Sequence, residues 1–358
     1  MCLETKKNPD KTVTSTGAHF WPFPVWLGAF YSVWLLLMVN LDAWSQVASN
    51  WGIAVAMAFG SYFAGSTPMG GGTVGFPVLT LLFDHPASLG RDFGLAVQSI
   101  GMVSASVFIF VRRRPVDWSL LGPALIGSAV GTPIGSAFVA PHIPDLAVKL
   151  IFAVTWAAFG IIHWLKIEAI VRPEGPRVPH DRLDRPLGLL VGVAGGMLAA
   201  VTGVGIDMMI YALLVLFYRC DLKVAIPTSV ILMAFTSVIG ILSNIGLSVF
   251  APKQYMVDIN VLWNWLAAAP VVALGAPLGA IVIERLPRAP TLLIVSTLCV
   301  AQLVWMLIDQ SVMGWQLALT LVALGAISVL FLHLFHLGHH NHFAIAGDKP
   351  AASDKVAK

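Results

Sequence analysis

Charged residues are scarce in this chain, and their scarcity argues against a soluble globular domain. Asp, Glu, Lys and Arg make up 11% of the 358 residues, whereas 58% are hydrophobic. Soluble domains carry about 25% charged residues. The net charge is only +3, and the basic residues lie in loops between apolar segments, which argues against a nucleic-acid partner. This composition is typical of a polytopic membrane protein, whose partner is the lipid bilayer.

Motifs for metal, nucleotide or catalytic chemistry are also missing. Three cysteines leave no basis for a disulfide framework or a CxxC metal site. The sequence contains no GxxxxGK[ST] loop, which argues against ATP-driven pumping by this chain. No HExxH motif or Ser-His-Asp arrangement lies in the apolar segments. We therefore expect neither an enzyme nor a cofactor.

Long apolar segments alternate with two glycine-rich regions. A membrane-spanning helix needs about 20 apolar residues. The segments of that length are residues 21–41, 93–111, 119–139, 146–165, 223–250, 261–283, 291–308 and 312–337. The glycine-rich regions, residues 51–83 and 187–217, are too short for two crossings and long for one. We interpret each as a re-entrant or broken helical hairpin.

The break in the first region is expected at GSTPMGGG, residues 65–72. Glycine tolerates any φ, and Pro68 removes a backbone donor, so two short helices should be joined there by irregular backbone. Gly203 and Gly205 mark the corresponding break in the second region. Irregular backbone survives at membrane depth only where it is buried in protein or lines a wet cavity.

Three motifs recur in the same order, which indicates a duplicated unit. MGGGTVGFPVL (69–79) matches VGIDMMIYALL (204–214), LAVQS (95–99) matches AIPTS (225–229), and GTPIG (131–135) matches GAPLG (275–279). The GxPxG pair, centred on Pro133 and Pro277, is expected mainly to pack or kink two spans, with pathway lining as the alternative.

Basic residues predict the orientation. If each hairpin returns to the side from which it enters, one side of the membrane holds all of the 21 Lys and Arg except Arg91, Lys149 and Lys253. The positive-inside rule makes it cytoplasmic. Each copy then has a hairpin and three spans, an odd number of crossings, so the two copies should be inverted, as in alternating-access transporters.

The predicted fold is therefore an all-α polytopic membrane protein with two inverted repeats and one extra helix at each end. Its parts are a cytoplasmic N-terminal segment (1–20), a first transmembrane helix (21–41), repeat 1 (51–165), a cytoplasmic linker (166–186), repeat 2 (187–308), a last transmembrane helix (312–337) and a cytoplasmic His-rich tail (338–358). His-rich tracts can bind metal, but no Cys or carboxylate partner is fixed near this one, so no metal site is predicted.

The glycine motifs resemble the sulfite exporter TauE/SafE family, also called the toluene sulfonate uptake permease family. The resemblance covers roughly residues 51–310 and rests on MGGGTVGFPVL, on TGVGIDMMIYALL with AIPTS, and on RRRPVDW (112–118). The second copy departs from the pattern, because Ile206 and Asp207 stand in place of glycines and Ala212 in place of proline. The resemblance implies a cell (inner) membrane transporter of a small anion such as sulfite, a sulfonate, sulfoacetate or thiosulfate.

The hairpin tips are the predicted anion site. Backbone N–H groups at the starts of half-helices, and the positive end of the helix dipole, favour an anion. The alternative is that these glycines only permit close helix packing. Hydroxyl and amide side chains could add donors, or could bond back to their own helix. The predicted substrate-binding residues are Ser66, Thr67, Gly70, Gly71, Gly72, Gln98, Ser99, Thr202, Gly203, Gly205, Thr228 and Ser229.

Asp207 is the candidate for proton coupling. A lone carboxylate inside an apolar segment is usually paired, protonated or functional. If it were charged beside a bound anion it would repel that anion, so it could act as a proton switch. The alternative is that Asp207 accepts backbone N–H bonds and caps the second half-helix.

The leading hypothesis is a secondary transporter for a small, sulfur-containing anion, and the alternative is an anion channel. The sequence leaves open the particular anion, the direction of transport, the coupling ion and whether the chain forms a homo-oligomer.

Overall fold

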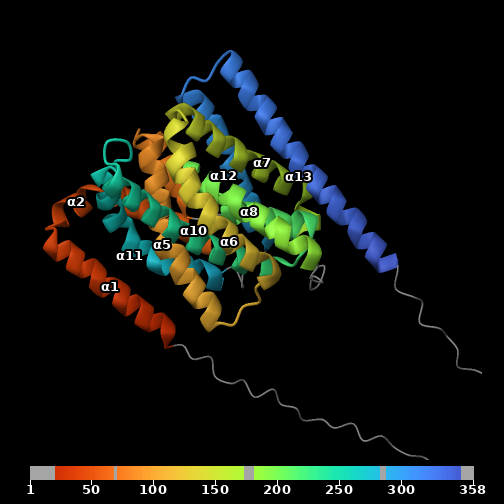
Figure 1. Ribbon diagram of the computed structural model, residues 1–358, viewed down its shortest axis with the longest axis horizontal. Coiled ribbons are helices and arrows are strands. Elements are labelled where there is room, and N and C mark those ends of the chain that lie inside the picture. The colour runs from red at the N-terminus through yellow and green to blue at the C-terminus, as the bar shows by residue number, and fades with distance from the viewer. Residues whose placement is uncertain (1–20, 68–70, 173–180, 283–287, 348–358) are drawn as a thin grey trace, which may run out of the picture.

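The computed structural model describes residues 21–67, 71–172, 181–282 and 288–347. Over these residues the regular structure is entirely helical (Figure 1). The α-helices are α1 (Pro22–Asn40), α2 (Trp44–Ser49), α3 (Trp51–Ser66), α4 (Gly72–Pro77), α5 (Ala87–Val111), α6 (Trp118–Ile134), α7 (Asp145–Val171), α8 (Asp181–Thr202), α9 (Ile206–Ala212), α10 (Leu222–Phe250), α11 (Ile259–Val282), α12 (Arg288–Asp309) and α13 (Trp315–Gly347). Three π-helical turns, η1 (Val78–Leu82), η2 (Gly135–Val139) and η4 (Leu213–Phe217), and the 3-10 turn η3 (Ala140–His142) complete them.

Nine of the described helices are long and apolar enough to cross a membrane. Eight correspond to the predicted spans, which confirms a polytopic all-α membrane protein. The ninth is α8, which begins at Asp181 and so takes up part of the predicted linker. Its first turns are held by packing on α6: a Cβ at Gly188 would lie 2.7 Å from the Leu120 carbonyl oxygen. Tertiary contact, which hydropathy does not report, extends this helix.

Both glycine-rich regions form hairpins that return to the side they enter. In the first, a Cβ at Gly52, at the start of α3, would lie 3.1 Å from the Phe83 ring, which follows η1. In the second, the Tyr218 hydroxyl, just after η4, donates a 2.7 Å hydrogen bond to Asp184 near the start of α8. The short second arms, Gly72–Leu82 and Ile206–Phe217, each contain a π turn.

The hairpins pack on the opposite halves of the chain. Helix α3 lies against α11, and α8 lies against α6, while α5 packs on α10 and α7 on α12. The GxPxG motifs provide these contacts. A Cβ at Gly131 would overlap the Val193 carbonyl of α8, and one at Gly279 would overlap the Tyr62 carbonyl of α3. Because only glycine permits such close approach, the packing interpretation of these motifs is confirmed.

Helices α1 and α13 flank the bundle on two sides (Figure 1), and most of their side chains are exposed. Helix α13 continues beyond the predicted last span to Gly347, so the first part of the predicted tail is helical. The side chains of His339, His340 and His342 lie outside the described part of the structure. Among the described residues, no group of three His, Cys, Asp or Glu side chains could hold a metal ion.

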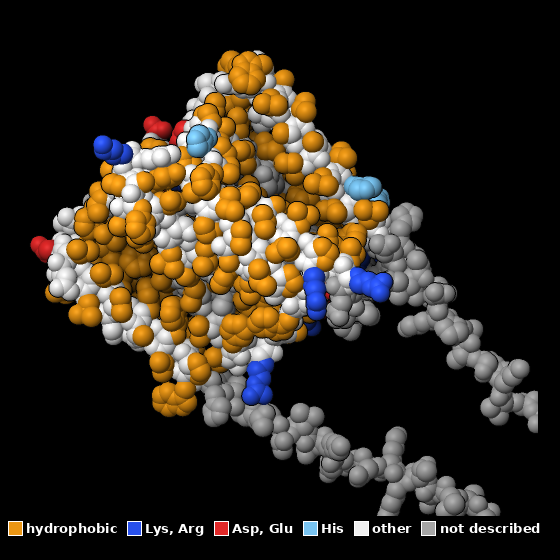
Figure 2. Space-filling model, viewed as in Figure 1, with side chains coloured by type: hydrophobic (Ala, Val, Ile, Leu, Met, Phe, Trp, Pro, Cys, Tyr) orange, Lys and Arg blue, Asp and Glu red, His pale blue; other side chains and the backbone are white. Residues whose placement is uncertain are grey.

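The connections between helices lie at two opposite sides of the bundle. In Figure 1 the start of α1, the α5–α6 connection and the end of α13 lie toward the lower right. The α1–α2, α10–α11 and α12–α13 connections lie toward the upper left. Figure 2 shows hydrophobic side chains covering the face between them, with most of the visible Lys and Arg toward the lower right. This division agrees with the predicted topology, whose cytoplasmic assignment stays a prediction.

Candidate functional site

The second hairpin tip is a sharp backbone break. Helix α8 ends at Thr202, and α9 begins at Ile206 after Gly203 (φ +82°) and Gly205 (φ +116°). L side chains rarely adopt such angles, so glycine is needed at both positions. Gly203 also has no room for a side chain, because a Cβ would lie 2.5 Å from the Arg91 carbonyl oxygen of α5.

The first tip is broken at the predicted place. Helix α3 ends at Ser66, and α4 begins at Gly72. Gly70 and its two preceding residues lie outside the described residues, as does the side chain of Ser66. Thr67, Gly71 and Gly72 are buried.

The described parts of the two tips lie against each other at Gln98 of α5. Its Nε2 donates to the Gly203 carbonyl (2.9 Å) and to the Gly94 carbonyl (3.1 Å). A Cβ at Gly72 would lie 2.7 Å from this Nε2 and would overlap Val204. The structure thus brings together Gly71, Gly72, Gln98 and Gly203. Their role in anion binding stays a prediction.

In this conformation the described parts of the two tips leave almost no space between them. A gap of about 10 Å³ lies beside Gly71 and Gln98, and a water molecule needs at least about that much. The Gln98 Oε1 is buried and has no hydrogen-bond partner among the described residues. The described parts of the tips are therefore closed in this state.

The predicted hydroxyl ligands are engaged elsewhere. Ser99 donates to the Ala96 carbonyl (2.7 Å), Thr228 to the Val224 carbonyl (2.6 Å) and Ser229 to the Ile226 carbonyl (2.9 Å). The Thr202 hydroxyl lies within hydrogen-bond distance of the Leu198 and Val204 carbonyls. These bonds match the alternative interpretation, in which such side chains bond to backbone nearby in sequence.

A larger cavity, of about 320 Å³, lies beside the second tip. The start of α5, the end of α10, the α6–α7 turns and the α10–α11 connection line it, so it lies on the predicted external side. Val201, one residue before the break, also lines it. The lining polar residues include Arg91, Asp92, Ser136, Asn244 and Tyr255.

Arg91 and Asp92 form the charged pair of this cavity. The Arg91 Nε lies 2.7 Å from the Asp92 Oδ1, which also accepts a 2.8 Å bond from Asn244. Sequence reasoning missed both residues as ligands, because hydropathy began the span at residue 93, whereas α5 begins at Ala87. Arg91 was identifiable only as one of three basic residues on the predicted external side.

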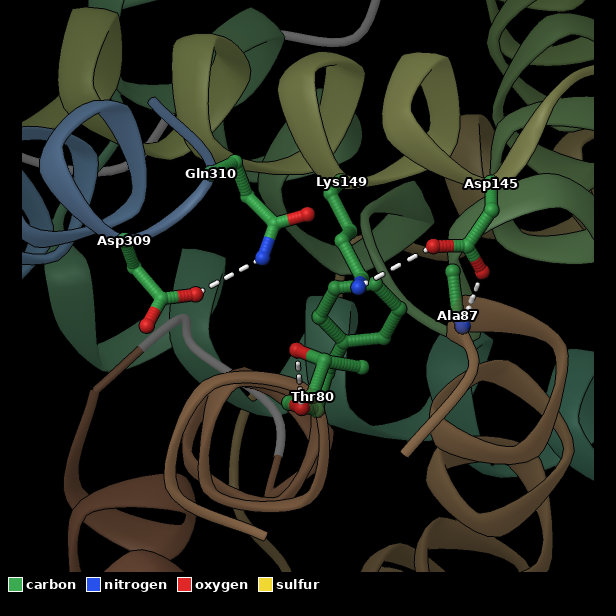
Figure 3. Close-up of polar contacts among 7 residues, drawn as sticks. Thr80, Ala87, Asp145, Lys149, Asp309 and Gln310 are labelled. Carbon is green, nitrogen blue, oxygen red and sulfur yellow. Dashed lines mark hydrogen bonds and ion pairs between the residues drawn. The ribbon is translucent and has the colours of Figure 1, made fainter. Parts of the chain in front are cut away.

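A second ion pair stands at the rim of the cavity (Figure 3). The Asp145 carboxylate lies 3.0 Å from the Lys149 ammonium group. It also accepts a hydrogen bond from the Ala87 backbone N–H. Lys149 is buried, and Thr80 lies close by in the close-up. This network ties the start of α5 to α7, so the cavity wall on that side is held by charge-assisted bonds.

Asp207 is buried near the start of α9. Its Oδ1 accepts the Gly205 N–H (3.2 Å) and the Met208 N–H (3.0 Å). These bonds support the capping interpretation. The proton-switch interpretation is not excluded by them and stays a prediction.

His163 is a further buried polar residue that sequence reasoning did not single out. Its Nδ1 lies 2.8 Å from the Phe159 carbonyl and its Nε2 lies 3.2 Å from the Tyr211 hydroxyl of α9. The available signal was a single histidine inside an apolar segment. The pair links the short arm of the second hairpin to α7.

Fold and site together define a multi-pass membrane protein with two broken hairpins that meet beside a polar cavity. The sequence model of the family "Sulfite exporter TauE/SafE" matches residues 52–306. The chain therefore belongs to the TauE/SafE family, and it is a membrane transporter of that family. No curated protein and no solved structure matches it.

Proposed function

We propose that this protein is a secondary transporter that moves a small sulfur-containing anion of the sulfite, sulfonate, sulfoacetate or thiosulfate type across the inner cell membrane by alternating access. Family membership supports the class of substrate. The observation that carries the proposal for this chain is the cavity of about 320 Å³, which Val201 lines close to the broken second tip.

One cationic group in the cavity can attract an anion on its way to the tips. Arg91 is the only basic residue among those that line it. Its guanidinium can offer several N–H groups to one oxyanion. Beyond the cavity, the start of α4 would present backbone N–H groups near the middle of the bundle, as predicted from the sequence. At the start of α9 the Asp207 carboxylate accepts the Gly205 and Met208 N–H groups in this conformation.

A carrier fits the closed tips better than a channel does. A channel needs a continuous path in its conducting state. Here the cavity lies on one side of the tips, and the gap between the described residues Gly71 and Gln98, about 10 Å³, is too small for an anion. In alternating access the tips would separate as one half of the bundle moves against the other, and the cavity would then open on the opposite side.

Counterflow in proteoliposomes tests the proposal. Purified full-length protein would be reconstituted in vesicles loaded with sulfite, thiosulfate, sulfoacetate or acetate, and uptake of the radiolabelled anion would be followed. We expect saturable uptake that is accelerated by one internal sulfur anion and not by acetate. Absence of exchange for every sulfur anion would overturn the proposal. Single-channel currents without counterflow would favour the anion channel instead.

A further inference from the structure

We propose that the cavity at the start of α5 is itself an oxyanion-binding site, in which Arg91 and Ser136 hold the anion and Asp92 acts as a built-in competing carboxylate. The inference rests on the proposed function, since the ligand is the transported anion on the external side of the closed tips.

Arg91 has unused donors in the cavity. It bonds to Asp92 through Nε, and its two terminal nitrogens have no hydrogen-bond partner among the described residues. The side chain is 19% exposed, so it is largely removed from bulk water. A planar guanidinium presents its terminal N–H groups as a fork that matches the oxygens of a sulfite or sulfonate group.

Ser136 is the independent sign of a ligand. Its hydroxyl is buried, 4% of the residue is exposed, and it has no hydrogen-bond partner in the described structure. Such a group costs free energy unless a ligand or water satisfies it. Ser136 belongs to the π turn η2 and lines the same cavity as Arg91.

Asp92 neutralises the charge of Arg91 while no anion is bound. Its Oδ1 receives both the Arg91 Nε and the Asn244 amide. An arriving oxyanion must share Arg91 with this carboxylate and is also repelled by it. The carboxylate therefore lowers affinity, which allows the anion to leave toward the tips instead of remaining trapped.

The dimensions of the cavity are sufficient for a small anion. The cavity volume of about 320 Å³ is at the lower end of the range of small-molecule sites, about 300–1,000 Å³. Tyr255 closes part of the wall and donates a 2.8 Å bond to the Ala137 carbonyl, one residue from Ser136. Sulfite, thiosulfate and short-chain sulfonates fit this description.

Binding to the purified full-length protein tests the site. Calorimetric titration with sulfite and with methanesulfonate, at constant ionic strength, would compare the parent with Arg91→Gln, Arg91→Lys, Asp92→Asn and Ser136→Ala. The matched control is Lys253→Gln, because Lys253 is basic and exposed on the same predicted side but does not line the cavity. Gel filtration would verify that each variant is folded.

We expect opposite signs from the two members of the ion pair. Arg91→Gln should weaken binding at least about tenfold, in line with the loss of charge-assisted bonds, and Arg91→Lys should recover part of it. Ser136→Ala should weaken binding a few-fold, and Lys253→Gln should leave it unchanged. Asp92→Asn should tighten binding several-fold, because it removes the repulsion of the anion. The new side chain keeps an oxygen that can accept the hydrogen bond from Asn244.

Two outcomes would overturn the inference. Unchanged binding in Arg91→Gln, while the parent still binds and exchanges the anion, would place the site elsewhere and leave the transport function intact. Weaker binding in Asp92→Asn would show that the carboxylate positions Arg91 and does not compete. If the parent neither binds nor exchanges any sulfur oxyanion, the proposed function fails and the site with it.

Discussion

The two hairpin tips use glycine for different physical reasons. At the first tip Gly71 has an ordinary φ of −57°, and Gly72 is needed because Gln98 and Val204 pack against it. At the second tip Gly203 and Gly205 have positive φ, so the backbone conformation itself requires glycine. The position that matches Gly72 in the second copy is Asp207, a buried carboxylate. Among the described residues, the duplicated motif therefore provides close packing at both tips, and backbone reversal with a polar cap at the second.

The largest expected difference between the two copies is their orientation in the membrane. In a background without Cys2, Cys220 and Cys299, we expect Lys253→Cys to react with an impermeant maleimide from outside intact cells, and Arg182→Cys to react only after permeabilisation. The reason is the unequal distribution of Lys and Arg between the two sides. External labelling at position 182 would refute the inverted arrangement and the proposed location of the anion site.

Substitution at the second tip should have the next largest effect. Gly203→Val should abolish anion exchange, because the left-handed conformation is strained for valine, by about 1–3 kcal/mol, and because the side chain would meet the Arg91 carbonyl. Uptake by proteoliposomes would measure this, with immunoblotting of the membrane fraction as a control for insertion. Normal exchange in this variant would place the translocation pathway away from the tip.

The first tip can be examined with two neighbouring alanine substitutions, one at Gly72 and one at Gly71. Gly72→Ala should lower the exchange rate about tenfold, since its methyl group would push apart Val204 and Gln98, and overpacking costs about 1–3 kcal/mol. Gly71→Ala should change the rate less than about twofold, because it meets mainly the flexible Met57 methyl group, at 3.3 Å. Adding Val204→Ala should restore part of the activity of Gly72→Ala. Equal effects of the two alanines would show that close packing is not what matters at the first tip.

The smallest effect is expected at Asp207, the carboxylate that matches Gly72 in the second copy. Asp207→Asn keeps an acceptor for the Gly205 and Met208 N–H groups and mimics the protonated acid, so stability should change by less than about 1 kcal/mol. If Asp207 is the proton switch, the parent should exchange anion faster as pH falls, because protonation removes the repulsion. The variant should then be active and independent of pH. An unchanged pH profile would leave Asp207 only its capping role.

Hydropathy and the glycine motifs predicted most of the helical elements. The eight spans, the two hairpins and the break between Thr202 and Ile206 could be predicted because bilayer thickness, glycine φ and proline chemistry act locally on the chain. The glycine motifs likewise predicted the TauE/SafE family. The start of α8 was predicted too late, because its first turns are held by α6.

The amino-acid sequence by itself determined that this chain crosses the membrane many times, breaks at two glycine-rich tips and belongs to a transporter family. The tertiary structure alone decided which polar groups face a cavity. Asp92 meets Asn244 across 152 positions, and Gln98 meets Gly203 across 105, whereas Ser99 and Ser229 bond within their own helices. The physical reason is that a buried polar group takes whichever partner the packing places within hydrogen-bond distance, and that packing joins distant helices of the two halves.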